Sequence, residues 1–186
     1  MHYERTDEFQ QVLDLLRVES PRLLFVTGSA GTGKSTLIDV LRAELDRNLV
    51  VVAPTGVAAR NVRGQTIHSF FQLPPGPQPR ARRIQGPGRD VIAKMDVLVI
   101  DEVSMVRADL LDAVDDALRV NTGRPNVTFG GTAVVLIGDM HQLPPVIAGS
   151  EERRLFESSY ESPYFFSALC LARQPLTAVT LTRSFR

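Results

Sequence analysis

The sequence predicts an α/β domain of three layers, in which helices cover both faces of a mainly parallel sheet. First, short apolar strands alternate with helical patterns along the chain, which is typical of parallel sheets. Second, 44% of the 186 residues are hydrophobic and 23% are charged, a balance that supplies one sizeable core. Third, glycine-rich and acidic segments directly follow strands, where open α/β sheets bind their ligands.

The N-terminal part predicts a helix, a strand and a second helix. The first helix begins at Thr6, a typical N-cap residue that is followed by two acidic residues. Its apolar face consists of Phe9, Val12, Leu13 and Leu16. A short buried strand follows at Leu23–Thr27, and a glycine-rich turn then opens a helix over residues 33–46.

The next part predicts a strand, two short helices and a loop. The strand Leu49–Ala53 ends at Pro54, which cannot continue a ladder of hydrogen bonds. Residues 55–63 and 66–71 are predicted as short helices. Residues 72–89 are rich in Pro and Gly, so we expect a long, mobile surface loop there.

The second half predicts two further buried strands, a helix and a last strand. Residues Val97–Ile100 and residues 133–137 are unbroken apolar runs, which favours fully buried strands. A helix between them is indicated by the spacing of Leu110, Leu111, Val114, Ala117 and Leu118. We expect a loop over residues 121–131 and a last strand over residues 176–181.

Charge and composition exclude several classes of protein. The chain has 21 basic and 21 acidic residues, so no global positive field indicates nucleic-acid binding. The longest apolar runs are far shorter than the roughly 20 residues of a membrane span, and we expect no membrane partner. The single cysteine, Cys170, cannot form an internal disulfide, which fits a reducing compartment.

The strongest motif is a phosphate-binding loop between the first strand and the second helix. Residues 28–35 match G-x-x-x-x-G-K-[ST] in that setting. The glycines let backbone N–H groups point at phosphate oxygens, Lys34 reaches the β- and γ-phosphates, and Ser35 ligates Mg²⁺. A plain glycine-rich turn is the alternative, against which the flanking strand and helix argue. The candidate ATP-binding residues are Gly28, Ser29, Ala30, Gly31, Thr32, Gly33, Lys34, Ser35 and Thr36.

An acidic pair follows the apolar strand at residues 97–100. We expect Asp101 to hold Mg²⁺ and Glu102 to polarise the attacking water. A solvated pair that caps the next helix is the alternative. The carboxyl end of a buried strand, in a chain that also carries a phosphate loop, favours the catalytic role.

A third strand-to-loop junction, residues 136–145, lies on the same edge of the predicted sheet. Gln142 is neutral and can both donate and accept hydrogen bonds, which suits a side chain that senses a γ-phosphate. A turn stiffened by Pro144 and Pro145 explains the same spacing equally well.

Taken in order, these motifs resemble the first RecA-like domain of the Pif-type helicases, relatives of RecD in superfamily 1. The resemblance runs through nearly the whole chain and is far more specific than a phosphate loop alone. Besides that loop, the matching segments are residues 53–59 and 64–70 for motif Ia, 101–105 for motif II, 129–131 with 138–145 for motif III, and 181–186 for the start of motif IV.

The resemblance implies a P-loop NTPase that uses ATP and Mg²⁺ to move along single-stranded DNA, from 5′ to 3′, and to unwind duplex at its junctions. It implies that Gln10, which we favour over Gln11, reads the adenine edge. It also implies that Arg186 is a catalytic motif IV arginine. The family places ATP between two RecA-like domains, so we expect residues 1–186 to be the first domain and the second domain to be its partner.

Contacts with single-stranded DNA are assigned by the resemblance to Thr55, Gly56, Val57 and His68. Backbone N–H groups and a hydroxyl at a helix start suit phosphate contacts that read no sequence. For His68, a partly buried helix histidine is an equal alternative. Phe70 and Phe71 are expected in the core rather than under a stacked base.

Two surface segments carry weaker indications. Residues 146–163 stand where relatives insert a small strand-separating domain, but the segment here is short and charged. A solvated loop is favoured over an electrostatic rail for DNA at Arg80, Arg82, Arg83 and Arg89.

Two other functions stay open at this point. One is a module that binds nucleotide or DNA without turnover, and the other is a P-loop ATPase of the clamp-loader type, against which residues 138–145 argue. For a helicase we expect a role in DNA repair or recombination and, in a bacterium, a nucleoid-associated place in the cytoplasm. A nucleus or a mitochondrion also fits the composition.

Overall fold

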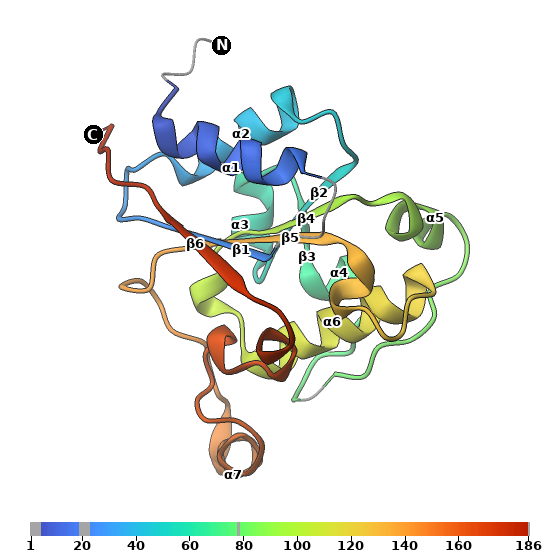
Figure 1. Ribbon diagram of the computed structural model, residues 1–186. Helices are drawn as coiled ribbons and strands as arrows, with labels where there is room; N and C mark the ends of the chain where they lie inside the picture. The colour runs from blue at the N-terminus through green and yellow to red at the C-terminus, as the bar shows by residue number, and fades with distance from the viewer. Residues whose placement is uncertain (1–4, 19–22, 78, 186) are drawn as a thin grey trace.

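The computed structural model describes residues 5–18, 23–77 and 79–185. Their strands form one six-stranded parallel sheet with the order β3-β2-β4-β5-β1-β6 (Figure 1). The strands are β1 (Leu23–Thr27), β2 (Leu49–Ala53), β3 (Gln65–Thr66), β4 (Val97–Ile100), β5 (Ala133–Gly138) and β6 (Leu176–Thr180).

Helices and short 3₁₀ turns connect these strands. The helices are α1 (Asp7–Arg17), α2 (Lys34–Glu44), α3 (Gly56–Asn61), α4 (Ile67–Phe71), α5 (Pro87–Lys94), α6 (Ala108–Thr122) and α7 (Gly149–Ser159). The 3₁₀ turns are η1 (Val103–Met105), η2 (Thr128–Gly131), η3 (Phe165–Ser167) and η4 (Leu169–Arg173). Figure 1 shows α1 and α2 on one side of the sheet and α4, α5 and α6 on the other.

Side chains of each central strand alternate between two apolar clusters, one on each face of the sheet. In β4, Leu98 and Ile100 belong to the cluster that contains α6, and Val97 and Val99 belong to the cluster that contains α1 and α2. All four side chains are buried, because helices cover both faces. The predicted three-layer α/β architecture with a parallel sheet is therefore confirmed.

The order of the strands brings three sequence motifs to one edge of the sheet. β5 lies between β1 and β4, with Gly138 opposite Thr27 and Leu136 opposite Ile100. The residues that follow these strands therefore emerge side by side at the carboxyl ends. β6 lies beyond β1 as an outer strand of the sheet, and Leu176 at its start is 40% exposed.

The prediction of a long loop over residues 72–89 is wrong in part. Leu73 and Ile84 are buried in the core, and the N–H of Ile84 donates to Oδ1 of Asn121 at 2.7 Å. The helix α5 begins at Pro87, because proline is well tolerated in the first turn of a helix, where its missing N–H costs nothing. Pro and Gly therefore marked a helix start here as well as a loop.

Smaller differences concern short elements and ends of elements. The two-residue strand β3 was not predicted, and the last strand ends at Thr180, one residue before the expected end. The helix α7 lies within the polar segment 146–163 and extends away from the sheet at the lower end of Figure 1. Among the described residues, no helix combines the length and the apolar character needed to cross a bilayer.

Candidate nucleotide-binding site

The phosphate loop and the ends of β4 and β5 open onto one hollow of about 620 Å³. This volume falls within the usual range of small-molecule sites. The structure thus brings together Lys34, Ser35, Glu102 and Gln142, which the sequence predicted as parts of one site. The lining residues are Ala30, Gly31, Gly33, Lys34, Ser35, Thr36, Glu102, Asp139, Gln142 and Phe185.

Two glycines of the loop are required by its local geometry. Gly33, the N-cap of α2, has a φ of +88°, which residues other than glycine rarely adopt. A Cβ atom on Gly28 would lie 2.5 Å from the hydroxyl oxygen of Thr32 and 2.9 Å from the carbonyl oxygen of Leu181. The loop therefore closes tightly, and the N-terminus of α2 opens into the hollow, where its dipole favours an anion.

Lys34 lies back over the loop that precedes it. Its ammonium donates to the carbonyl oxygens of Gly28 at 2.6 Å and of Ser29 at 3.0 Å. Thr32 also closes on Ser29, because its hydroxyl donates to the same carbonyl oxygen at 2.9 Å. The charge of Lys34 is thus held at the loop where phosphate oxygens are expected.

Asp101 is nearly enclosed at the end of β4. Asp101 is 6% exposed, and burial raises the pKa of its carboxyl to about 6. The positive charge of Lys34 acts in the opposite direction and lowers this pKa. A desolvated carboxylate of this kind is stabilised by a cation. Together with the hydroxyl of Ser35 in the first turn of α2, it is a donor set that fits Mg²⁺, which keeps several water ligands and needs few from the protein.

Glu102 occupies an uncommon backbone conformation. Its φ and ψ are +51° and +43°, in the left-handed region that costs energy for a residue with a Cβ atom. This turn separates the two neighbouring carboxyl groups. Asp101 is buried, while Glu102 lines the hollow, where it can reach a water molecule beside the phosphates.

Asp139 is a site residue to which the sequence analysis assigned no role. It is 6% exposed, and it accepts hydrogen bonds from the N–H of His141 at 3.0 Å and from the side-chain amide of Gln142 at 3.1 Å. The bond from His141 is the main cause of the lowered pKa of Asp139. The signal was present in the sequence, because this acidic residue follows a buried strand as Asp101 does.

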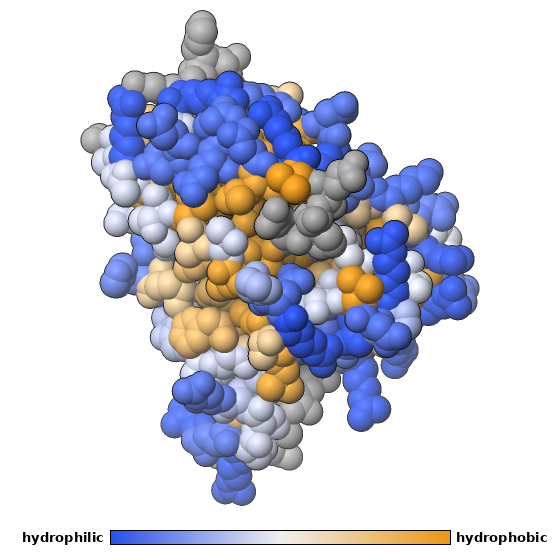
Figure 2. Space-filling view, in the orientation of Figure 1, coloured by the Kyte–Doolittle hydropathy of each residue, from blue (hydrophilic) through white to orange (hydrophobic). Residues whose placement is uncertain are grey.

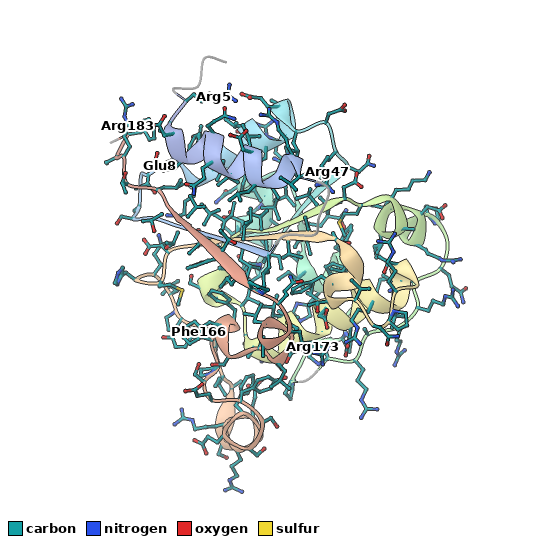
Figure 3. The ribbon with its side chains drawn as sticks, in the orientation of Figure 1. Arg5, Glu8, Arg47, Phe166, Arg173 and Arg183 are labelled. Atoms are coloured by element: carbon teal, nitrogen blue, oxygen red, sulfur yellow. The ribbon has the colours of Figure 1, made fainter. Side chains whose placement is uncertain are left out.

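The C-terminal segment also reaches the hollow. The N–H of Phe185 donates to the carbonyl oxygen of Gly31 at 3.0 Å, and the ring lines the hollow. The guanidinium of Arg183 lies 5.4 Å from the centre of this ring. The hydroxyl of Thr182 donates to the carboxylate of Glu8 at 2.7 Å, which joins α1 to this segment near the corner where Glu8 and Arg183 are labelled in Figure 3.

Some of the predicted ATP-binding residues do not line the hollow, and these are Gln10, Gly28, Ser29 and Thr32. The side-chain amide of Gln10 donates to Asp14 at 2.6 Å within α1, and the shallow surface depression beside it is lined by residues of α1 and by Val18. The predicted role of Gln10 stays a prediction. Arg186 lies outside the described residues.

The predicted DNA contacts lie on two short helices. The hydroxyl of Thr55 caps α3 by accepting from the N–H of Ala58 at 3.2 Å, and Val57 is 62% exposed. His68 on α4 is half-buried, and burial followed by the charge of Arg107 lowers its pKa. His68 thus has the features of a partly buried helix histidine, and its DNA role stays a prediction.

The aromatic and basic side chains near these helices lie where the alternatives without DNA contacts predicted them, the aromatic rings at the core and the arginines in solvent. Phe71 is buried in the core, and the partly buried Phe70 packs edge-on against it with ring centres 4.8 Å apart. The four arginines of the predicted loop are exposed, with Arg89 in the first turn of α5 and Arg80, Arg82 and Arg83 in the segment before that helix.

Comparison with known families and proteins identifies clear relatives. The sequence model of the family described as PIF1-like helicase matches residues 1–182. The ATP-dependent DNA helicase PIF1 of Emericella nidulans is 38% identical over 184 residues, covering 91% of this chain and 23% of that protein. The human helicase of the same name is 40% identical over 150 residues, covering 78% of this chain and 23% of that protein. The chain thus spans about a quarter of these relatives.

Solved structures agree over the same region. The Bacteroides Pif1 structure in complex with ADP-AlF4 has a TM-score of 0.91 at 39% identity, covering 100% of this chain and 43% of that chain. The structure of Bacteroides Pif1 bound to ssDNA has a TM-score of 0.90 at 38% identity, covering 99% and 43%. Both likenesses extend over the sheet and its two helical layers.

Proposed function

Because the chain belongs to the PIF1-like helicase family, we propose that it is the first ATP-binding domain of a DNA helicase. This motor couples ATP hydrolysis to movement along single-stranded DNA and to unwinding of duplex. The observation that carries the proposal is the meeting of Lys34, Glu102 and Gln142 on one hollow at the carboxyl ends of adjacent strands.

The residues of this chain divide the work on the nucleotide. Backbone N–H groups of the loop and the ammonium of Lys34 bind the phosphates. Glu102 accepts a hydrogen bond from the attacking water and orients it toward the γ-phosphorus. Ser35 and Asp101 would hold Mg²⁺, which would supply positive charge to offset that of the phosphates. Gln142, held by Asp139, donates to the γ-phosphate and loses that partner after hydrolysis.

The remaining nucleotide contacts are proposed at the margin of the hollow. The side-chain amide of Gln10 leaves Asp14 and hydrogen-bonds the adenine edge. Gln10 lies on α1, which the bond between Glu8 and Thr182 joins to the C-terminal segment. Arg186 supplies a further positive charge, and a second RecA-like domain closes over the nucleotide. Such arginines contribute about 10³ to 10⁵ in turnover in other P-loop enzymes.

Single-stranded DNA is proposed to cross the surface that carries α3 and α4. Thr55, Gly56 and Val57 offer exposed backbone and side-chain atoms at the start of α3, and His68 lies on the neighbouring helix. Contacts of this kind bind the phosphate backbone and read no sequence. Because of the family resemblance, we propose that the motor moves from 5′ to 3′ along the strand. On the same ground we propose a role in DNA repair or recombination.

The test is an ATPase assay with and without single-stranded DNA on the full-length protein and its Lys34→Ala variant. We expect DNA to stimulate the wild-type protein, and we expect the variant to lose turnover while keeping its fold. Forks that carry a single 5′ or 3′ tail then measure polarity. An ATPase rate that ignores DNA, with no strand separation on either fork, would rule out the helicase proposal.

A further inference from the structure

Arg107 joins three separate parts of the chain directly after the η1 turn. Its guanidinium pairs with both carboxylate oxygens of Asp109 at 3.0 Å, and it donates to the carbonyl oxygen of Gly76 at 2.8 Å. It also donates to the carboxylate of Glu152 on α7. The side chains of Arg107, Asp109 and Glu152 are 16%, 0% and 10% exposed, so this network is largely shielded from solvent.

Glu152 connects the network to the start of α7. Its second carboxylate oxygen accepts from the N–H of Ala148, the N-cap residue of this helix. Phe156, one turn further along α7, places its ring centre 5.6 Å from the Arg107 guanidinium. One cation therefore holds both the start and the inner face of α7.

The segment that contains α7 is also attached at its other end. The N–H of Ala108 donates to the carbonyl oxygen of Pro163 at 3.0 Å, and the hydroxyl of Tyr160 donates to Asp112 at 3.0 Å. These bonds do not involve the Arg107 side chain. A variant without that side chain therefore keeps the segment attached to α6, while it loses the contacts with α7 together with those to Asp109 and Gly76.

The network lies five residues after Glu102, with the buried η1 turn between them. Gly138 at the end of β5 packs so closely on η1 that a Cβ atom would lie 3.0 Å from Val103. Within η1, the buried hydroxyl of Ser104 has no hydrogen-bond partner among the described residues. The η1 turn is thus a short, closely packed connection between Glu102 and Arg107.

We propose that Arg107 is a positioning residue that links the orientation of α7 to the segment after Glu102, so that α7 follows the state of the nucleotide during unwinding. This inference rests on the proposed helicase function. The contacts that carry it are those of Arg107 with Glu152 and Phe156 on one side and the short η1 connection to Glu102 on the other.

The link is tested by spin labels in the full-length protein. Arg154→Cys on α7 and Val120→Cys on α6 replace exposed residues, and the native Cys170 of this chain is buried. The distance distribution between the labels is measured without nucleotide and with ADP-AlF4 plus single-stranded DNA. Other reactive cysteines of the full-length protein are first replaced. The variants are Arg107→Met, which keeps the apolar stem, and Glu152→Gln, with Glu157→Gln as the exposed control on the same helix.

We expect the wild-type distribution to shift with ADP-AlF4, and Arg107→Met to broaden it and remove the shift. Glu152→Gln has a smaller effect in the same direction, and Glu157→Gln has none. In parallel, base pairs unwound per ATP hydrolysed fall about tenfold in Arg107→Met, while DNA-stimulated ATPase stays within about threefold of wild type.

Two results would overturn the link. One is a wild-type distribution that does not change with nucleotide, and the other is a wild-type response in Arg107→Met. Both are read from distances, so they are distinguishable from a failure of the helicase function, which would show as a missing response of ATPase to DNA in the wild-type protein.

Discussion

The side-chain amide of Gln142 donates a hydrogen bond at 3.1 Å to Asp139, three residues earlier in the same loop. Asp139 also accepts from the N–H of His141, so its carboxylate fixes both the backbone and the side chain of this loop. Gln142 therefore faces the hollow in a defined orientation, although its loop, residues 139–148, contains no helix or strand.

Asp139→Ala should lower the DNA-stimulated ATPase rate, because Gln142 loses the group that orients it. Loss of the partners that orient metal ligands costs about 10- to 100-fold in metal sites, and we expect a loss of similar size here. Steady-state kinetics should show the loss mainly in kcat, and Asp139→Asn, which keeps an acceptor oxygen, should lie between the two. Equal kcat values for Asp139→Ala and wild type would show that Gln142 needs no such support.

Lys34→Ala should abolish tight ATP binding and turnover, since a methyl group cannot replace a cation at the phosphates. Binding of a fluorescent ATP analogue and circular dichroism together separate lost binding from lost fold. Lys94→Ala is the matched control, because this exposed residue, the other lysine of the chain, lies in the last turn of α5. Wild-type turnover in a folded Lys34→Ala protein would disprove the phosphate-loop assignment.

Glu102→Gln should keep ATP binding and lose most hydrolysis, because the amide retains the shape and lacks the basic oxygen. The expected loss is about 10² to 10⁴ in rate. Asp101→Ala should instead weaken the binding of Mg²⁺ and raise the Mg²⁺ concentration needed for half-maximal rate. If both variants gave the same curve in a Mg²⁺ titration, the two carboxyl groups would not have separate roles.

Asp115→Ala should destabilise the fold by about 2–4 kcal/mol. Asp115 is 2% exposed, accepts from the N–H of Phe129 at 2.5 Å and pairs with Arg119 at 3.3 Å, so its loss leaves the buried N–H of Phe129 without its acceptor and removes the shorter ion pair of Arg119. Urea unfolding measures the change. The neighbouring Asp116, whose side chain is 65% exposed, is the control, and Asp116→Ala should stay within about 0.5 kcal/mol.

The link between Glu8 and Thr182 should make stability depend on pH. The Thr182 hydroxyl is the largest cause that lowers the pKa of Glu8 from 4.5 to about 2. The folded state therefore gains stability from the ionised carboxylate above about pH 4.5 and loses it as pH falls toward 2. In thermal unfolding, Glu8→Gln should have a slightly lower melting temperature than wild type at pH 7, and the difference should become smaller in acid. Thr182→Val should show the same trend. A gap that is constant with pH would contradict this assignment.

The parts of the site that could be predicted from sequence are those where chemistry restricts the residue type. A phosphate loop needs glycine at the left-handed position of Gly33, and carboxylates at a strand end, such as Asp101 and Glu102, are the residue types that the proposed metal and water roles require. The core strands were equally clear, because β4 and β5 are unbroken apolar runs covered on both faces.

The parts that could not be predicted depend on contacts between distant residues. Glu8 and Thr182 are 174 residues apart, and Phe185 lies at the hollow with its backbone N–H bonded to the carbonyl oxygen of Gly31. The network of Arg107 joins segments whose meeting follows from packing on α6. Pro87 was ambiguous, since the same residue suits a loop and the first turn of a helix.

The outer edge of β6 bears on solubility. No further strand pairs with this edge in the described part of the chain, and Figure 2 shows apolar side chains gathered on the face where β6 lies. Phe166, Leu169 and Leu176 are 50%, 57% and 40% exposed. An open strand with apolar neighbours is a template for pairing with a second molecule and for aggregation. Covering this edge, or placing a charge at Leu176, would keep concentrated protein monodisperse without altering the nucleotide-binding hollow.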